Sequence, residues 1–393
     1  MKAPLLALSM LALLCGVAAA DSNVTPRGDL DSAWHQFHTL KKGHVAFLGG
    51  SITEMEGYRP MVCELLQKQF PDTQFTFTAA GVSSTCSTTG AFRFQEDVLS
   101  KGPVDLLFVE YAVNDDQDAH HTREECIRGM EGIVRHLRRV NPSADIVMTF
   151  FLNESSMEQY NAGQIPLPIR AHTEVAEYYH ISTINLAKTV TSRIAAGEFD
   201  WKKFGGVHPA PFGNRIAADM IAELFQAKWG AAPQGAAHPR PFPEKPLDEK
   251  CYSRGRFMQV AELEINAPWS IHVPDWKSLP GGKRDRFTKE PMIEGLKPGS
   301  ELGFAFEGTA VGAYILAGPD AGMVEVSIDG EAPRKVNLFH KHSANLHYPR
   351  TVMFADTLSD GKHTLRLKIC EEMDEKASGQ AFRALHFVLN DGK

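Results

Sequence analysis

A serine follows an apolar run early in the chain and lies in a turn made of glycines. The run covers residues 44–48, and Gly49-Gly50-Ser51-Ile52-Thr53 comes directly after it. A strand that ends in such a turn lifts the serine hydroxyl out of the sheet, where a base can reach it. A Gly-Gly-Ser tripeptide alone is more often an ordinary turn. The prediction of a nucleophilic serine therefore depends on what the rest of the chain supplies.

Three later segments supply the groups that a nucleophilic serine needs. A hydroxyl is a poor nucleophile at neutral pH without a base, and a carbonyl under attack needs hydrogen-bond donors for its oxyanion. Gly81 follows a second strand-like run, Asn114 follows a third, and His208 comes shortly before the last helical segment. Singly, each is better explained as a turn glycine, a helix cap or a surface histidine. Their order and their common position near strand ends favour a hydrolytic site.

These segments resemble the four sequence blocks of the SGNH hydrolases, also called GDSL-type esterases. The matching segments are Gly49-Gly50-Ser51-Ile52-Thr53, Gly81, Ala112-Val113-Asn114-Asp115 and Val207-His208-Pro209. The resemblance implies that Ser51 is the nucleophile and that His208 is the general base and later the general acid. It also implies an oxyanion hole made of the backbone N–H groups of Ser51 and Gly81 and the side-chain amide of Asn114. Each such donor typically lowers the barrier by about 3 to 4 kcal/mol.

The chain departs from the family pattern at three positions. Gly50 replaces the usual aspartate of the first block and Ala112 replaces a glycine of the third, and we expect the fold to accommodate both. More seriously, Gly205 stands where the family places the aspartate that orients its histidine. Three explanations remain open: a Ser-His dyad oriented by a backbone carbonyl, an acid supplied by Glu110 or Asp200, or an inactive site. The retained serine, histidine and asparagine favour the first two.

Strand-like runs alternate with amphipathic helices in the part of the chain that carries these residues. Helices are predicted between the runs, and Thr122 with Glu125 forms a capping-box sequence at the start of one of them. This order predicts a three-layer α/β/α sandwich around a parallel sheet, which is the flavodoxin-like fold that the resemblance implies. Five short apolar or β-branched segments are predicted as buried strands, at residues 44–48, 74–78, 104–110, 145–151 and 182–185.

The two ends of the chain have different residue patterns. Residues 1–20 read as a signal peptide with a charged start, a short apolar run and a small-residue cleavage site after Ala20. We therefore expect a secreted or periplasmic protein, and lipidation at Cys15 is the lesser alternative. Past the hydrolase domain at residues 21–230 and a Pro-rich linker at 231–250, residues 251–393 alternate apolar with polar positions. That alternation, with turns at Asp329-Gly330 and Asp360-Gly361, predicts a jelly-roll-like β-sandwich.

Composition excludes several classes of partner and cofactor. The net charge of −7 without a basic stripe argues against binding to nucleic acid or to anionic membrane surfaces. The cysteines after the signal peptide show no close pairing and no Cys-x-x-Cys spacing, so neither a disulfide scaffold nor a zinc site is predicted. His120 and His121 lie beside Asp116 and Asp118, but adjacent histidines rarely converge on one ion. No cofactor and no membrane span are predicted, and the oligomeric state stays undetermined.

The β-sandwich guides the prediction of a substrate. Residues 306–311 and 326–330 resemble modules found beside carbohydrate esterases, which implies removal of O-acetyl groups from a polysaccharide or glycoconjugate. A broad lipase or arylesterase, or a non-catalytic glycan-binding protein, remains the alternative. Tyr58, Arg59, Arg93 and the polar loop at residues 116–121 are candidates to line the cleft, with solvated surface as the more common role of each. The aromatic residues that would stack on sugars, if exposed, are Trp269, Trp276, Tyr314 and Tyr348, although aromatic residues of a β-sandwich more often belong to its core.

Overall fold

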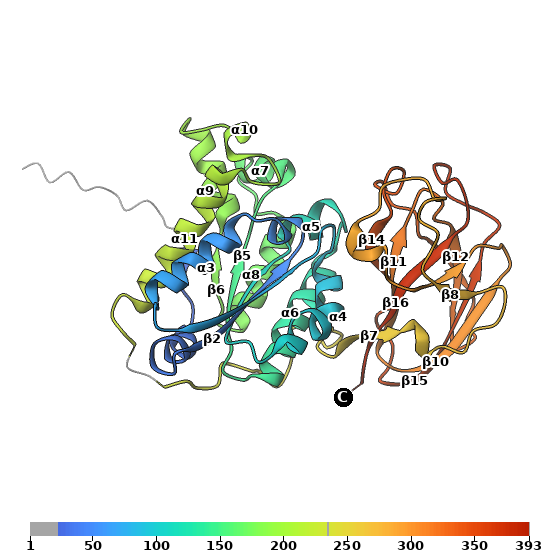
Figure 1. Ribbon diagram of the computed structural model, residues 1–393, viewed down its shortest axis with the longest axis horizontal. Helices are drawn as coiled ribbons and strands as arrows, with labels where there is room; N and C mark the ends of the chain where they lie inside the picture. The colour runs from blue at the N-terminus through green and yellow to red at the C-terminus, as the bar shows by residue number, and fades with distance from the viewer. Residues whose placement is uncertain (1–22, 234–235, 393) are drawn as a thin grey trace, which may run out of the picture.

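An α/β domain and a β domain lie side by side in the computed structural model, which describes residues 23–233 and 236–392 (Figure 1). The predicted signal peptide lies outside the described residues. Within the part that is described, no helix is both long enough and apolar enough to cross a lipid bilayer.

The α/β domain is built on a six-stranded sheet in the order β1-β6-β5-β4-β2-β3. The five strands from β2 to β6 are parallel, and the two-residue β1 pairs antiparallel with β6 at one edge. All five predicted strands are present, which confirms the parallel sheet. The strands are β1 (Val24–Thr25), β2 (Lys42–Gly49), β3 (Gln74–Gly81), β4 (Leu106–Glu110), β5 (Asp145–Thr149) and β6 (Ser182–Ile184).

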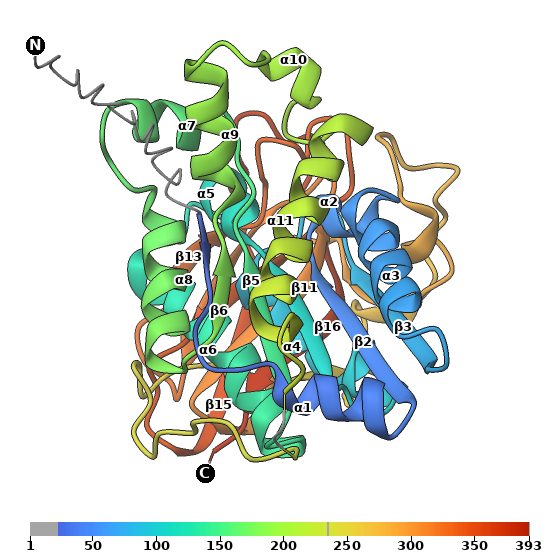
Figure 2. The same cartoon turned by 90° about the vertical axis from the view of Figure 1, so that its left-hand side faces the viewer.

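Helices cover both faces of this sheet and complete the predicted three layers (Figures 1 and 2). Because both faces are covered, β4 and β5 are buried along their whole lengths and read as continuous apolar runs. One layer contains α3 (Tyr58–Gln69), α9 (Leu186–Ala195) and α11 (Pro211–Trp229), and the other contains α4 (Ser87–Asp97), α6 (Arg123–Val140) and α8 (Leu167–Tyr178). The shorter helices are α1 (Asp31–Trp34), η1 (His35–Thr39), α2 (Ser51–Glu54), η2 (Leu99–Lys101), α5 (Ala112–Gln117), α7 (Glu154–Asn161) and α10 (Trp201–Phe204).

The capping box predicted at Thr122 and Glu125 begins helix α6. The Thr122 hydroxyl accepts the Glu125 N–H at 3.2 Å, and the Glu125 carboxylate accepts the Thr122 N–H at 2.8 Å. Two N–H groups that the helix leaves unpaired at its start are satisfied in this way.

Strand β2 occupies the point where the strand order reverses. It pairs with β3 on one side and with β4 on the other, so that Gly49 lies opposite both Gly81 and Glu110. In open parallel sheets, ligands bind beyond the carboxyl ends of the strands at such a point. The residues that end or follow β2, β3 and β4 therefore meet at one edge of the sheet.

The β domain consists of two antiparallel sheets with an apolar core between them. The predicted turn at Asp329-Gly330 joins β12 to β13, and both residues have positive φ angles, of 54° and 79°. One sheet has the order β10 (Glu301–Gly308), β15 (Gly361–Ile369), β12 (Met323–Ile328) and β13 (Arg334–Asn337). The other has β14 (Tyr348–Ala355), β11 (Ala310–Ala317), β16 (Phe382–Asn390), β9 (Met292–Gly295) and β8 (Ser270–His272), with β7 (Gly255–Gln259) also paired to β16.

The apolar core of the α/β domain continues into the β domain, beside the separate core that lies between the two β-sheets. Helix α4 packs against β7, β14 and β16, and the rings of Phe92 and Tyr252 have their centroids 4.8 Å apart. The connecting residues 236–250 contain no helix or strand and run against α6. There the Glu131 carboxylate accepts the N–H groups of Leu247 and Asp248, at 2.7 and 2.9 Å. These contacts hold the β domain at a defined place beside the α/β domain.

Candidate active site

Ser51 and His208 are in hydrogen-bond contact. Ser51 is the first residue of α2 and comes directly after the Gly50 N-cap at the end of β2. His208 is exposed in the loop between α10 and α11. Nε2 of His208 lies 2.8 Å from Oγ of Ser51. An imidazole at this distance can take the serine proton as the hydroxyl attacks a carbonyl carbon.

The other nitrogen of the His208 ring has no hydrogen-bond partner, side chain or backbone, among the described residues. Asp200 caps α10 instead, where its Oδ1 accepts the Lys203 N–H at 2.6 Å. Glu110 is fully buried in β4; the Val113 N–H is near its carboxyl group, but no hydrogen bond of normal geometry forms within the described chain. Neither considered acid bonds the imidazole, so the contact geometry is that of a serine-histidine pair.

Backbone geometry explains why position 205 is a glycine. Gly205 ends α10 in the left-handed conformation, with a φ angle of 111°. A Cβ atom at this position would lie 2.0 Å from the backbone nitrogen of Ala210. An aspartate here would require both a strained φ angle and a rebuilt loop.

The candidate oxyanion donors surround the turn that carries Ser51. Asn114 is the third residue of α5 and its side chain is buried. A Cβ atom on Gly50 would lie 2.0 Å from Oδ1 and 3.2 Å from Nδ2 of Asn114, so the amide lies directly against this turn. At the end of β3, a Cβ atom on Gly81 would lie 2.2 Å from the backbone nitrogen of Glu54 in α2. Glycine at both positions lets the three segments approach one another closely.

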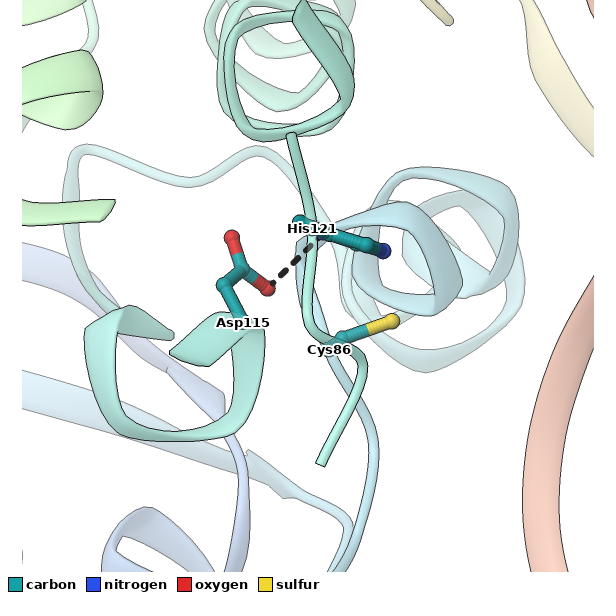
Figure 3. Close-up of side chains that lie close together, drawn as sticks. All are labelled: Cys86, Asp115 and His121. Carbon is teal, nitrogen blue, oxygen red and sulfur yellow. Dashed lines mark ion pairs between the residues drawn. The ribbon is translucent and has the colours of Figure 1, made fainter. Parts of the chain in front are cut away.

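Asp115, the neighbour of Asn114, anchors α5 in the interior. Its carboxylate accepts the N–H and the hydroxyl of Ser87 at 2.8 and 2.7 Å, and Nε2 of His172 lies 3.0 Å away. Nδ1 of His121 is 3.5 Å from the same carboxylate (Figure 3). Burial would raise the pKa of Asp115, but the neighbouring His121 and His172 hold it well below its usual range. A charged carboxylate held from several sides fixes the start of α5, and with it Asn114.

This network also contains atoms that could ligate a metal. Cys86, Asp115 and His121 bring such atoms within 4.8 Å of one another, and Asp115 does so again with Cys126 and His172. The sequence argued against a metal at His120 and His121, and the groups that the structure places beside His121 are Cys86, the N-cap of α4, and Asp115 of α5. The contacts recorded for Asp115 are hydrogen bonds and ion pairs. The cysteines of the described residues are all free.

Arg93 is a site residue that sequence reasoning misinterpreted. The sequence offers it as a cleft-lining or surface side chain, but it is fully buried in α4. Its guanidinium donates to the backbone carbonyls of Gly49 and Ala80, at 3.0 and 2.7 Å, and to the Tyr111 hydroxyl at 2.8 Å. It therefore ties together the ends of β2 and β3. Tyr58 is buried as well, and no pattern in the sequence separates these two side chains from surface residues.

Three of the four aromatic residues predicted to stack on sugars if exposed do not lie on the surface. Trp269, Tyr314 and Tyr348 are buried. Trp276 is half-buried, with its ring edge-on to His347 at a centroid distance of 5.0 Å. The stacking role required exposure, which the first three lack.

Residues 47–216 match the model of the GDSL-like Lipase/Acylhydrolase family, a range that contains Ser51, Gly81, Asn114 and His208. No curated protein matches the chain. A crystal structure of a two-domain esterase active on acetylated mannans is similar over 94% of this chain and 98% of its own, with a TM-score of 0.73 and 20% identity. A second, co-crystallised with mannopentaose, has the same coverage, a TM-score of 0.72 and 19% identity. This likeness shows that the two-domain fold is shared.

Replacing Gly205 by the family's aspartate should destabilise the protein without raising its turnover. We expect Gly205→Asp to lower the free energy of unfolding by more than about 3 kcal/mol, because φ strain and a backbone clash act together. Gly197→Asp is the matched control, since Gly197 also has a positive φ angle, of 75°, but open space around it. It should cost about 1 kcal/mol. Urea unfolding measures both, and equal losses would contradict the explanation.

Glu110 should make stability depend on pH. Burial and the negative charge of Asp115 raise the pKa of Glu110 to about 8, from 4.5. A raised folded-state pKa contributes stability that is complete below the unfolded value and is lost as the pH rises through about 8. Wild type should thus lose a few kcal/mol more than Glu110→Gln between pH 5 and 9. Unfolding at both pH values tests this, with the exposed Glu158→Gln as control; parallel curves for wild type and Glu110→Gln would refute it.

Proposed function

We propose that the protein is a serine esterase acting through Ser51 and His208, because residues 47–216 match the model of the GDSL-like Lipase/Acylhydrolase family. The observation that carries the proposal is the 2.8 Å contact between Nε2 of His208 and Oγ of Ser51. The close packing of Asn114 against Gly50 supports it, because it brings an amide to the same turn.

In the proposed mechanism, the Ser51 hydroxyl attacks the ester carbonyl while Nε2 of His208 accepts its proton. The oxyanion that develops accepts hydrogen bonds from the Ser51 and Gly81 N–H groups and from the Asn114 amide. Collapse of this intermediate expels the alcohol, which takes the proton back from His208 and leaves an acyl group on Ser51. Water, deprotonated by His208, then attacks the acyl-enzyme and releases the carboxylic acid.

In this mechanism, solvent rather than a carboxylate stabilises the positive charge of the imidazolium. His208 is exposed, so water can hydrate the charge on the ring as it develops. In a serine protease that normally has the aspartate, replacing this group lowers turnover about 10⁴-fold. A chain without the acid therefore relies more heavily on its oxyanion donors for rate.

We propose O-acetyl groups of a polysaccharide or glycoconjugate as the substrate. The two-domain esterases that share the fold act on acetylated mannans, which supports an acetylated glycan here. A half-buried serine beside an exposed histidine suits a polymer that cannot enter a closed cavity. Export through the signal peptide, with cleavage after Ala20, would bring the enzyme to such a polymer outside the cytoplasm.

Aryl acetate turnover tests the catalytic pair. Ser51→Ala and His208→Ala should each lower kcat at least about 10³-fold, because nucleophile and base act as a unit. Asp200→Asn is the matched comparison and should stay within about twofold of wild type, since Asp200 caps α10. Undiminished turnover in Ser51→Ala would refute the mechanism. A loss in Asp200→Asn as large as in His208→Ala would instead support a displaced acid.

Acetate release from a panel of acetylated polysaccharides tests the substrate. We expect release from at least one glycan, and a p-nitrophenyl ester series in which acetate is cleaved far faster than octanoate. Preference for octanoate would favour a lipase. Glycan binding without labelling of Ser51 by a fluorophosphonate would identify a non-catalytic glycan-binding protein.

A further inference from the structure

Two segments of the β domain contact the strand ends that carry the candidate oxyanion donors. One segment is the short helix η4 (Asp285–Phe287), which reaches the end of β3. The other is the loop between β13 and β14, which reaches the end of α5; Figure 1 shows α5 at the domain boundary beside β14. Both contacts cross the boundary between the domains.

Arg286 of η4 holds the end of β3 against α2. Its Nη1 donates to the carbonyl of Gly81 at 3.2 Å and pairs with Oε1 of Glu54 at 2.7 Å. The other oxygen of Glu54 accepts the Ser83 N–H at 2.8 Å. Burial would raise the pKa of Glu54, but the bonds from Ser83 and the charge of Arg286 hold it below its usual value. A charged Glu54, in the helix that begins with Ser51, therefore binds both Arg286 and Ser83, the residue two positions after Gly81.

Asp118 links the second segment to Asn114. Its Oδ2 accepts a hydrogen bond from Nδ2 of Asn114 at 2.7 Å. Its backbone carbonyl accepts from Nε2 of His340 at 3.0 Å, and its Oδ1 lies 3.6 Å from Nε2 of His342. The His340 ring is stacked on Tyr348 of β14, with ring centroids 4.3 Å apart. The contacts thus run without a gap from a strand of the β domain to the Asn114 amide.

The bond to Asp118 decides which way the Asn114 amide faces. A side-chain amide has a donor end and an acceptor end, and an acceptor facing an oxyanion would repel it. Because a carboxylate can only accept, Asp118 selects the orientation in which the nitrogen faces it. One N–H of that nitrogen is used by Asp118, and the second is left for another acceptor. Donors oriented in advance are worth most in a transition state, because no reorganisation is needed during the reaction.

We propose that the β domain completes the oxyanion hole, with Asp118, held by His342, as a positioning residue for Asn114, and with Arg286 as a positioning residue for Gly81. This rests on the proposed function, because it takes Asn114 and Gly81 as the donors. The β domain then sets the turnover number of the α/β domain, in addition to any binding of substrate.

A double-mutant cycle on the full-length protein tests the role of Asp118. We expect Asp118→Ala to lower kcat for an aryl acetate about 10²-fold, as loss of one oxyanion donor does, with KM within about twofold. Asp118→Asn, which retains an acceptor, should recover part of this loss. Asn114→Ala with Asp118→Ala should be no slower than Asn114→Ala alone, because both changes remove the same donor. Additive losses would overturn the proposal.

Variants in the β domain itself make the test independent of changes near the serine. His342→Gln and Arg286→Gln should each lower kcat about tenfold while KM and the melting temperature stay near wild type. Lys335→Gln is the matched control, because Lys335 forms an exposed ion pair with Glu372 in the same domain. Unchanged kcat in both His342→Gln and Arg286→Gln, with a large loss in Asn114→Ala, would overturn the positioning role alone. Unchanged kcat in Asn114→Ala would instead refute the proposed oxyanion hole.

Discussion

The site depends on the parallel pairing of β2 with β3 on one side and with β4 on the other. Parallel strands share one direction, so all three end at the same edge, and the register places Gly49 opposite both Gly81 and Glu110. The chain then has to turn away three times within a small volume. Close approach of these turns is what makes Gly50 and Gly81 necessary, because a Cβ atom at either position would overlap Asn114 or α2. The buried Arg93 satisfies the carbonyls left at two of the strand ends.

The same packing explains why the His208 loop differs from the usual pattern of the GDSL-type esterases that the chain resembles. The loop bends back after α10 through a left-handed Gly205 that touches the backbone of Ala210. A residue with a side chain does not fit this conformation, so the acid could not stay at its usual position once the loop took this path. Within the described chain, the hydrogen bond of this histidine is to the serine.

The β domain belongs to the structural unit that holds the site. It shares an apolar core with α4, and its polar side chains reach both Gly81 and Asp118. Buried aromatic residues such as Tyr314 and Tyr348 serve this packing instead of presenting flat surfaces to solvent. A domain attached in this way can affect the geometry of the reacting groups as well as the choice of substrate.

Local sequence patterns predict the five parallel strands, the capping box of α6 and the alternating β domain. They also predict the serine, asparagine and histidine that lie at strand ends or in loops. Each follows from patterns over a few neighbouring residues, which is the range over which periodicity and turn preferences act. What surrounds those residues follows from the packing of the folded chain. The hydrogen bonds of the buried Arg93, the network around Asp115 and the contacts of His342 and Arg286 all join residues far apart in the chain. The same is true of the surroundings of His208, where no acid among the described residues bonds the ring. Such contacts depend on how elements pack in space, and no local pattern encodes that packing.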